Sequence, residues 1–161
     1  MMRGLLMKAW REALGPTALL AAALFAIEAV LAVALPTILE QFSSQLLQWP
    51  FFEKIITALL GTEVSTASGA EVIQAIAWVH PVVLTVAWTH AIILCTRLPA
   101  GEVDRGTIDL LLGLPVSRPR AYACDAIVYL VSAIALIGAG IAGHLAGNAV
   151  RGGPAPDVAP E

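Results

Sequence analysis

Three long apolar stretches divide the chain, and polar segments separate them. The stretches cover residues 16–39, 75–98 and 126–150. Crossing the hydrocarbon core of a bilayer, about 30 Å thick, takes about 20 residues of α-helix. Each stretch is therefore long enough to span a membrane. We predict an all-α fold, a polytopic membrane helical bundle with three transmembrane helices.

The segment before the first stretch has the pattern of an amphipathic helix. Its apolar side chains fall on one face of a helical wheel: Leu5, Leu6, Trp10, Ala13 and Leu14. Gly15 and Pro16 follow and predict a break. We expect an N-terminal interfacial helix that leads into the first span. The alternative is that this segment simply continues the span.

Two further segments lie outside the spans. Residues 55–60 carry apolar side chains at helical spacing, which predicts a short outer helix on the membrane surface, and residues 61–69 read as a loop. Residues 151–161 are rich in Pro and Gly and show no periodicity, which predicts a flexible extracytoplasmic tail. We therefore expect one transmembrane domain, residues 1–150, followed by this tail.

Composition supports the membrane interpretation. The chain is 58% hydrophobic and 13% charged, whereas soluble domains are about 45–50% apolar. Lys and Arg number three before the first span, one in the loop 41–74, four in the loop 97–122 and one after the third span. Because basic loops stay in the cytoplasm, we expect a multi-pass protein of the cell membrane with a cytoplasmic N-terminus and an extracytoplasmic C-terminus.

No pattern points to chemistry within the chain. The sequence contains no phosphate-binding Gly-Lys-Ser/Thr loop, metalloprotease helix or Gly-x-Ser-x-Gly elbow. His80 and His90 would lie about 15 Å apart on one helix, too far to share a metal. We expect no enzyme activity, no cofactor and no metal site, and we interpret Cys95 and Cys124 as buried thiols.

The loop between the second and third spans, residues 99–120, contains its own helix signals. Thr107 is a candidate N-cap, Asp109 suits the first turn, and Pro115 prevents continuation. The resulting short helix has an apolar face, which must be covered by a partner or by the chain's own membrane domain. Ser117 can cap the third span.

At these residues the chain resembles the permease subunits of ABC type-2 transporters. The pattern stands here as Glu102, Arg105-Gly106-Thr107-Ile108-Asp109-Leu110-Leu111-Leu112 and Leu114-Pro115-Val116-Ser117-Arg118. The resemblance also takes in the amphipathic N-terminal segment, the outer helix and His80-Pro81. It implies that the short helix is a coupling helix, seated in a groove of a separate ATPase subunit.

The resemblance also implies partners and contact residues. The partners are a cytoplasmic ATP-binding cassette subunit, a second permease chain or a missing C-terminal half, and the lipid bilayer; no nucleic acid is expected. The residues that would contact the ATPase subunit are Glu102, Arg105, Gly106, Thr107, Asp109, Leu111, Leu112, Pro115 and Arg118.

The family usually has six spans, whereas three are predicted here. We therefore expect a permease subunit or half-subunit of an ATP-binding cassette exporter, which couples ATP hydrolysis by another chain to solute transport. The alternative is a small non-transporting membrane anchor or assembly protein that tethers a cytoplasmic partner by the same loop.

Polar and small residues within the spans give two further expectations. Glu28 lies in the middle of the first span, where a charged group is costly, so it should line a translocation path or pair with a polar neighbour. Gly143 and Gly147 form a Gly-x-x-x-Gly pair that permits close helix packing, within the chain or between two chains. Pro81 either kinks the second span or begins a helix.

Overall fold

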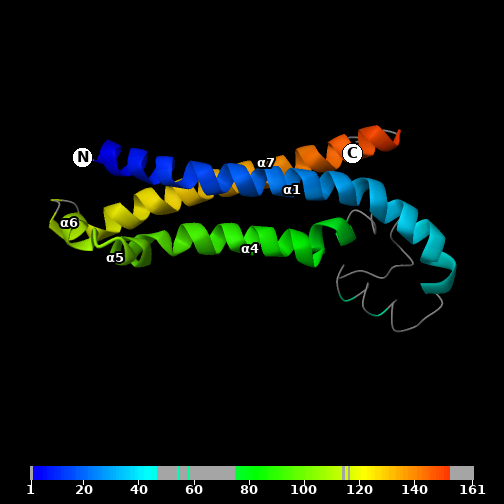
Figure 1. Cartoon of the computed structure of the whole chain (residues 1–161), viewed down its shortest axis with the longest axis horizontal. Coiled ribbons are helices and arrows are strands. Elements are labelled where there is room, and N and C mark those ends of the chain that lie inside the picture. The colour runs from blue at the N-terminus through cyan, green and yellow to red at the C-terminus, as the bar shows by residue number, and fades with distance from the viewer. Residues whose placement is uncertain are drawn as a thin grey trace, which may run out of the picture. The chain divides into compact units, whose positions relative to one another are not determined.

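The structure is a computed structural model, and it describes residues 2–46, 54, 58, 75–113, 115 and 117–152. Figure 1 shows that these residues form helices joined by short turns, with no strand among them. The predicted all-α fold class is confirmed for this part of the chain. The predicted loop 61–69 and the tail beyond Gly152 lie outside it, and of the predicted outer helix only Ala58 is described, in a helical conformation.

Six helical elements follow one another along the described chain. They are α1 (Met2–Leu46), α4 (Pro81–Cys95), the π-helical segment η1 (Arg97–Gly101), α5 (Glu102–Asp104), α6 (Ile108–Gly113) and α7 (Arg118–Arg151). The π-helical segment contains a kink at Leu98, whose backbone is extended. The predicted cytoplasmic loop is thus a series of short helical turns between α4 and α7.

The first helix does not break at Gly15 and Pro16. A single helix, α1, runs from Met2 to Leu46, so the prediction of a separate interfacial helix is wrong and the alternative, one continuous helix, holds. The reason lies in the buried face: Ala13 and Leu24 are each 2% exposed and are 11 residues apart, about three helical turns. Because the buried face continues in register past Pro16, packing offsets the cost of proline, about 3 kcal/mol.

Among the described residues, two helices are long and apolar enough to cross a membrane. They are the part of α1 from Arg3 to Ile38 and α7 from Arg118 to Arg151. The second predicted span, residues 75–98, is interrupted: residues 75–79 are helical, His80 is not, and the 15-residue helix α4 begins at Pro81. Pro81 therefore begins a helix, and Nδ1 of His80 accepts a hydrogen bond from the backbone N–H of Val82, 3.3 Å away.

The described residues group into two compact units. Unit 1 contains Met1–Leu24 and Thr85–Ala139, and unit 2 contains Phe25–Leu84 and Gly140–Glu161. The core of unit 1 is formed by Ala9, Ala13, Leu94 and Val128, with Tyr129 packed against it. Of the two cysteines expected to be buried, Cys124 is buried but Cys95 is exposed.

A second layer of packing in unit 1 surrounds His90. This side chain is 1% exposed, its ring stacks on that of Tyr129 with centroids 6.0 Å apart, and its Nε2 lies 3.4 Å from the hydroxyl of Thr17. Thr17 directly follows Pro16, so this contact also holds α1 in place just beyond the proline.

Candidate functional site

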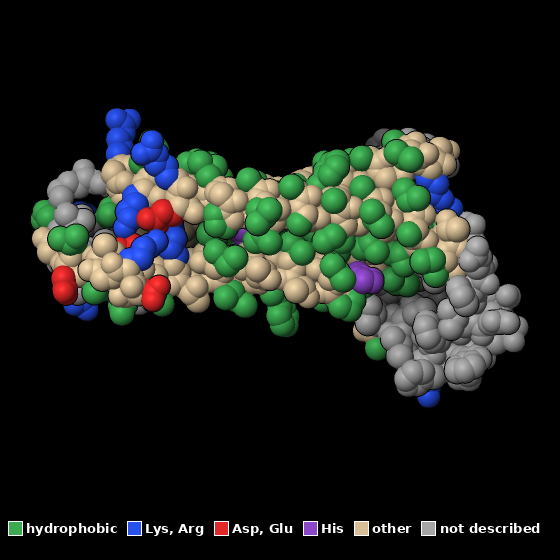
Figure 2. All heavy atoms as spheres, in the orientation of Figure 1, with side chains coloured by type: hydrophobic (Ala, Val, Ile, Leu, Met, Phe, Trp, Pro, Cys, Tyr) green, Lys and Arg blue, Asp and Glu red, His purple; other side chains and the backbone are tan. Residues whose placement is uncertain are grey.

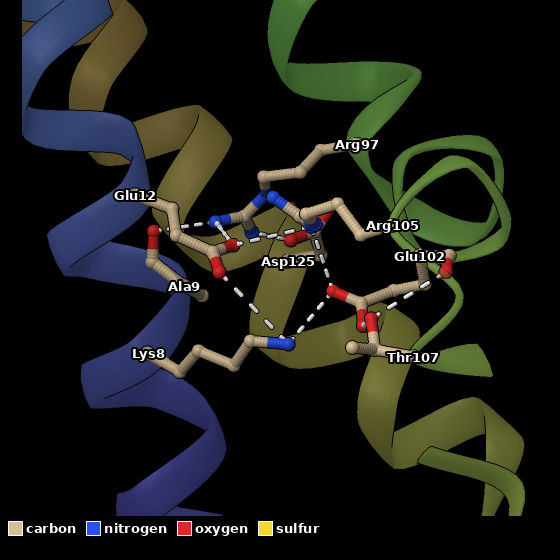
Figure 3. A network of polar contacts seen from close by, with 8 residues as sticks. All are labelled: Lys8, Ala9, Glu12, Arg97, Glu102, Arg105, Thr107 and Asp125. Carbon is tan, nitrogen blue, oxygen red and sulfur yellow. Dashed lines mark hydrogen bonds and ion pairs between the residues drawn. The ribbon is translucent and has the colours of Figure 1, made fainter. Parts of the chain in front are cut away.

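Glu102 is the centre of a group of charged and polar side chains in unit 1 (Figure 3). Its side chain is 2% exposed, and its carboxylate oxygens accept three short hydrogen bonds from other side chains. Oε1 accepts from Nζ of Lys8 at 2.7 Å and from Nη2 of Arg105 at 2.8 Å. Oε2 accepts from the hydroxyl of Thr107 at 2.6 Å. The carboxylate is therefore buried and bonded to side chains of the same chain.

Arg97 links the same group to α1 and α7. Its guanidinium donates to the backbone oxygen of Ala9 at 2.6 Å and to Oε2 of Glu12 at 3.2 Å, and it forms an ion pair with Asp125. Arg105 and Lys8 each lie 3.9 Å from the Glu12 carboxylate. We call these seven side chains the Glu102 cluster: Lys8, Glu12, Arg97, Glu102, Arg105, Thr107 and Asp125.

The Glu102 cluster is balanced in charge and joins three parts of unit 1. It has three basic and three acidic side chains, contributed by α1, the turns between α4 and α6, and α7. Burial of Glu102 raises its pKa. The hydrogen bonds from Lys8 and Thr107, and the charges of Lys8 and Arg105, lower it more, so its pKa falls from 4.5 to about 2. Glu102 is therefore ionised at neutral pH.

The turn that holds Glu102 depends on Gly106. Its φ is +67°, in the left-handed region that L side chains rarely adopt. This conformation lets the backbone N–H of Thr107 donate to the carbonyl of Glu102 at 2.9 Å, which closes the turn and brings the Thr107 hydroxyl onto the carboxylate. Thr107 then directly precedes α6, with Asp109 in the first turn of that helix.

The nine residues expected to contact an ATPase subunit divide into three groups. Glu102 is buried and Thr107 is partly buried in the cluster. Five are exposed on the turns around α6: Arg105, Gly106, Asp109, Pro115 and Arg118. The side chains of Leu111 and Leu112 lie outside the described part of the structure. Leu110, between them and Asp109, is 73% exposed, so α6 presents at least this apolar side chain to the surroundings.

Sequence reasoning did not find four members of the Glu102 cluster: Lys8, Glu12, Arg97 and Asp125. Lys8 and Glu12 lie in the segment predicted to be an interfacial helix, Arg97 lies within the predicted span 75–98, and Asp125 directly precedes the predicted span 126–150. One signal was present, because Ala9 and Ala13 are small residues at helical spacing and permit a close approach on the side of α1 next to Lys8 and Glu12.

Glu28 has a polar neighbour in unit 2. It is 0% exposed, and its Oε2 lies 3.2 Å from Nδ1 of His144 on α7. The other carboxylate oxygen, Oε1, is buried and accepts no hydrogen bond from any described residue. The structure thus brings together two polar groups that lie 116 residues apart in the sequence.

Gly143 and Gly147 make this approach possible. A Cβ atom at Gly143 would meet the backbone of Phe25, whose Cα lies 2.8 Å from that position, and one at Gly147 would meet the Cβ of Ala32 at 2.8 Å. The Gly-x-x-x-Gly pair therefore packs against α1 of the same chain. His144 follows Gly143 on the helix, so the close contact places its ring beside Glu28.

The described residues do not form a metal site, since they contain no group of three or more His, Cys, Asp or Glu side chains that could hold an ion. Their polar side chains form ion pairs and hydrogen bonds. Comparison of the chain with models of known protein families, with curated protein sequences and with solved structures found no match.

Proposed function

We propose that the chain is the membrane-spanning permease subunit, or half-subunit, of an ATP-binding cassette exporter. In this proposal a separate cytoplasmic ATPase binds the turns around α6, and ATP hydrolysis by that subunit drives solute transport. A second permease chain, or a C-terminal half, completes the pathway. The observation that carries the proposal is the sequence of residues 102–118, which resembles the coupling segment of such permeases. This segment contains the short helix α6, on which Asp109 and Leu110 are exposed.

The membrane location is supported by the distribution of side chains. Large apolar side chains face outward on all three long helices: Leu19 is 72% exposed, Trp88 70% and Ile134 71%. Polar side chains are buried instead, as Glu28 and His90 illustrate at 0% and 1%. Only 17% of the most apolar window of α1 and 28% of that of α7 are buried in the structure. A soluble protein would bury such helices, whereas lipid accommodates them.

Charged side chains are concentrated elsewhere in unit 1. Figure 2 shows basic and acidic side chains gathered near the start of α1 and the turns that carry α5 and α6. This agrees with a helix end and loop in water beside helices in lipid. We propose three spans, the second made of residues 75–79 and α4 together, with the N-terminus and the α5–α6 turns in the cytoplasm.

The Glu102 cluster suggests how motion at α6 would reach the spans. The turn that precedes α6 is tied by Glu102 and Thr107 to Lys8 of α1, and by Arg97 to Asp125 of α7. A partner that displaces α6 would therefore pull on both helices, rather than move a free loop. Glu102 acts in this proposal as a positioning residue, and the exposed Asp109 and Leu110 are the contact surface.

The test is purification of the full chain from its native membrane under mild conditions, followed by assay of the sample for an ATP-hydrolysing subunit. We expect such a subunit to accompany the wild type and to be lost in Leu110→Asp. Leu110 takes no part in the described ion pairs or hydrogen bonds, so this change leaves the Glu102 cluster intact. The matched control is Val103→Asp, which places the same charge at an exposed apolar position, 59% exposed, on α5.

A second variant tests the turn. Replacement of Gly106 and Thr107 together by bulky residues should weaken ATPase association while membrane insertion, measured by protease protection of the loops, stays intact. If insertion fails instead, the turn has only a structural role. If no ATPase accompanies the wild type, the permease assignment is wrong and the membrane-anchor alternative takes its place.

A further inference from the structure

Glu28 and His144 form a polar pair that the proposed function does not use. The Glu28 carboxylate is 0% exposed, and the His144 side chain is 11% exposed. They come from α1 and α7, the two helices that are long and apolar enough to cross a membrane. Polar groups at such positions are costly and commonly serve proton or ion binding.

The number of protons on the pair determines its charge. A carboxylate and a neutral imidazole together carry one negative charge. One added proton, placed on the carboxyl group, leaves two neutral groups, and a second, placed on the imidazole ring, makes the pair positive. Because an apolar environment disfavours net charge, the state with one shared proton is the one that the close contact of α1 and α7 favours.

The described titratable groups that act on the Glu28 carboxylate are His144, on α7, and His80, directly before α4. Both are histidines, so protonation of either ring would add positive charge near Glu28. Oε1 of Glu28 has no hydrogen-bond donor among the described residues, so the carboxyl group is not locked in the ionised state as Glu102 is.

The contact around the pair leaves little room for adjustment. Gly143 and Gly147 lie directly against the backbone and side chains of α1, at Phe25, Ala29 and Ala32. Interfaces packed in this way change between discrete arrangements and do not deform gradually. An unpaired charge buried in this contact is costly, so uptake of a second proton favours its separation.

We propose that Glu28 and His144 form a proton-binding site: the pair holds one proton and no net charge while α1 lies against α7, and uptake of a second proton opens this contact. The ligand of the site is the proton itself. The inference rests on the membrane location proposed above but not on an ATPase partner. Loss of ATPase binding and failure of this site are therefore separate outcomes.

The first test measures proton uptake in the wild-type chain, reconstituted in lipid nanodiscs. The chain has only three histidines, so ¹⁵N-labelled imidazole rings can be assigned by NMR with His80→Gln and His90→Gln. Between about pH 4 and about pH 8, which covers the ordinary range of Glu and His, the ring of His144 should gain a proton in one step. Glu28→Gln should displace the midpoint of that step.

The second test measures the contact. Spin labels at Val30 on α1 and Leu145 on α7, which are 64% and 53% exposed, report the distance between the helices of unit 2 after both native cysteines are replaced by serine. The distance should increase or broaden at the pH where His144 gains its proton. The response should be absent in Glu28→Gln/His144→Gln. It should persist in Asp104→Asn, which removes an exposed carboxylate of unit 1.

Two results would overturn the proposal. One is a His144 ring whose protonation does not change over this pH range, or changes identically with and without Glu28. The other is a distance that stays constant on acidification, or that still changes in the double variant. The first result needs only the wild type and one isosteric variant, so it decides the matter even if the double variant does not fold.

Discussion

Replacement of Glu102 by Gln removes the central charge of the Glu102 cluster and keeps its shape. In the wild type, ionised Glu102 faces Lys8 and Arg105, with Nζ at 2.7 Å and Nη2 at 2.8 Å. The variant leaves those two cations with weaker, neutral acceptors. Because Glu102 is buried and the cluster joins α1 to the turn before α6, we expect this turn to unfold more easily.

The magnitude follows from the pKa. A fall of the Glu102 pKa from 4.5 to about 2 corresponds to about 3 kcal/mol of stabilisation at neutral pH. Water screens part of this, since the side chains of Lys8 and Arg105 are 47% and 45% exposed, so we expect about 1–2 kcal/mol. A carboxyl with a depressed pKa stabilises the fold above its unfolded pKa. That contribution should disappear as the pH falls from about 4.5 to about 2.

The assay is hydrogen exchange of the backbone amides of residues 97–113, together with chemical unfolding of the full chain in micelles. At pH 7 the variant should exchange faster and unfold at a free energy lower by the amount given above. The difference from wild type should shrink on acidification through the stated window. Asp104→Asn, an exposed carboxylate on α5, should change the unfolding free energy by less than about 0.5 kcal/mol. Equal stability of Glu102→Gln and wild type at pH 7, or a difference that does not depend on pH, would refute the reasoning.

Two further predictions concern packing and hydrogen bonding. Gly143→Ala should destabilise unit 2, because the new Cβ would meet the backbone of Phe25. A Cβ at Gly138 would have nothing within 4 Å, so Gly138→Ala should stabilise α7 by up to about 1 kcal/mol. Thermal unfolding of both variants in one detergent compares them, and an equal loss of stability in the two would contradict the close contact at Gly143. Thr107→Val should remove the 2.6 Å hydrogen bond to Glu102 and so raise the pKa of that carboxyl group. On acidification, the backbone amides of the turn should therefore begin to exchange faster at a higher pH than in the wild type. An unchanged dependence of hydrogen exchange on pH would show that the hydroxyl is not needed.

The sequence was informative where one feature dominated. Long apolar stretches predicted helices, and two of them, in α1 and α7, have the length and composition of spans. Local signals also worked: Ser117 stands directly before α7, and its carbonyl accepts from the N–H of Arg120 at 3.0 Å. Such signals involve neighbours in the sequence and need no knowledge of the tertiary fold.

The break predicted at Gly15 and Pro16 failed for a tertiary reason. The prediction considered only the low helix propensity of proline at one position. The packing of the buried face of α1, from Ala13 to Leu24, instead decides that the helix continues. A sequence pattern can show that this face stays in register, but not that a partner covers it on both sides of the proline.

The Glu102 cluster and the Glu28 pair could be predicted only in part. Glu28 was singled out because an acidic residue inside an apolar stretch is unusual, and Glu102 because of the resemblance of residues 102–118 to ABC type-2 permeases. Their partners were not, because Lys8 is 94 residues from Glu102 and helical periodicity gives no distances between separate helices. Ion pairs of this kind require knowledge of how α1, α4 and α7 pack.

The 116 residues between Glu28 and His144 have a consequence for biosynthesis. At 5–20 residues per second, a ribosome needs about 6 to 23 s to make His144 after Glu28. In the membrane location proposed above, α1 reaches the bilayer during that time, before His144, the later neighbour of the Glu28 carboxyl group, has been made. The nascent chain therefore has to carry Glu28 in protonated form, or keep it within the insertion machinery, until α7 is complete. Contact between the two helices is accordingly a late step, which waits for the synthesis of α7.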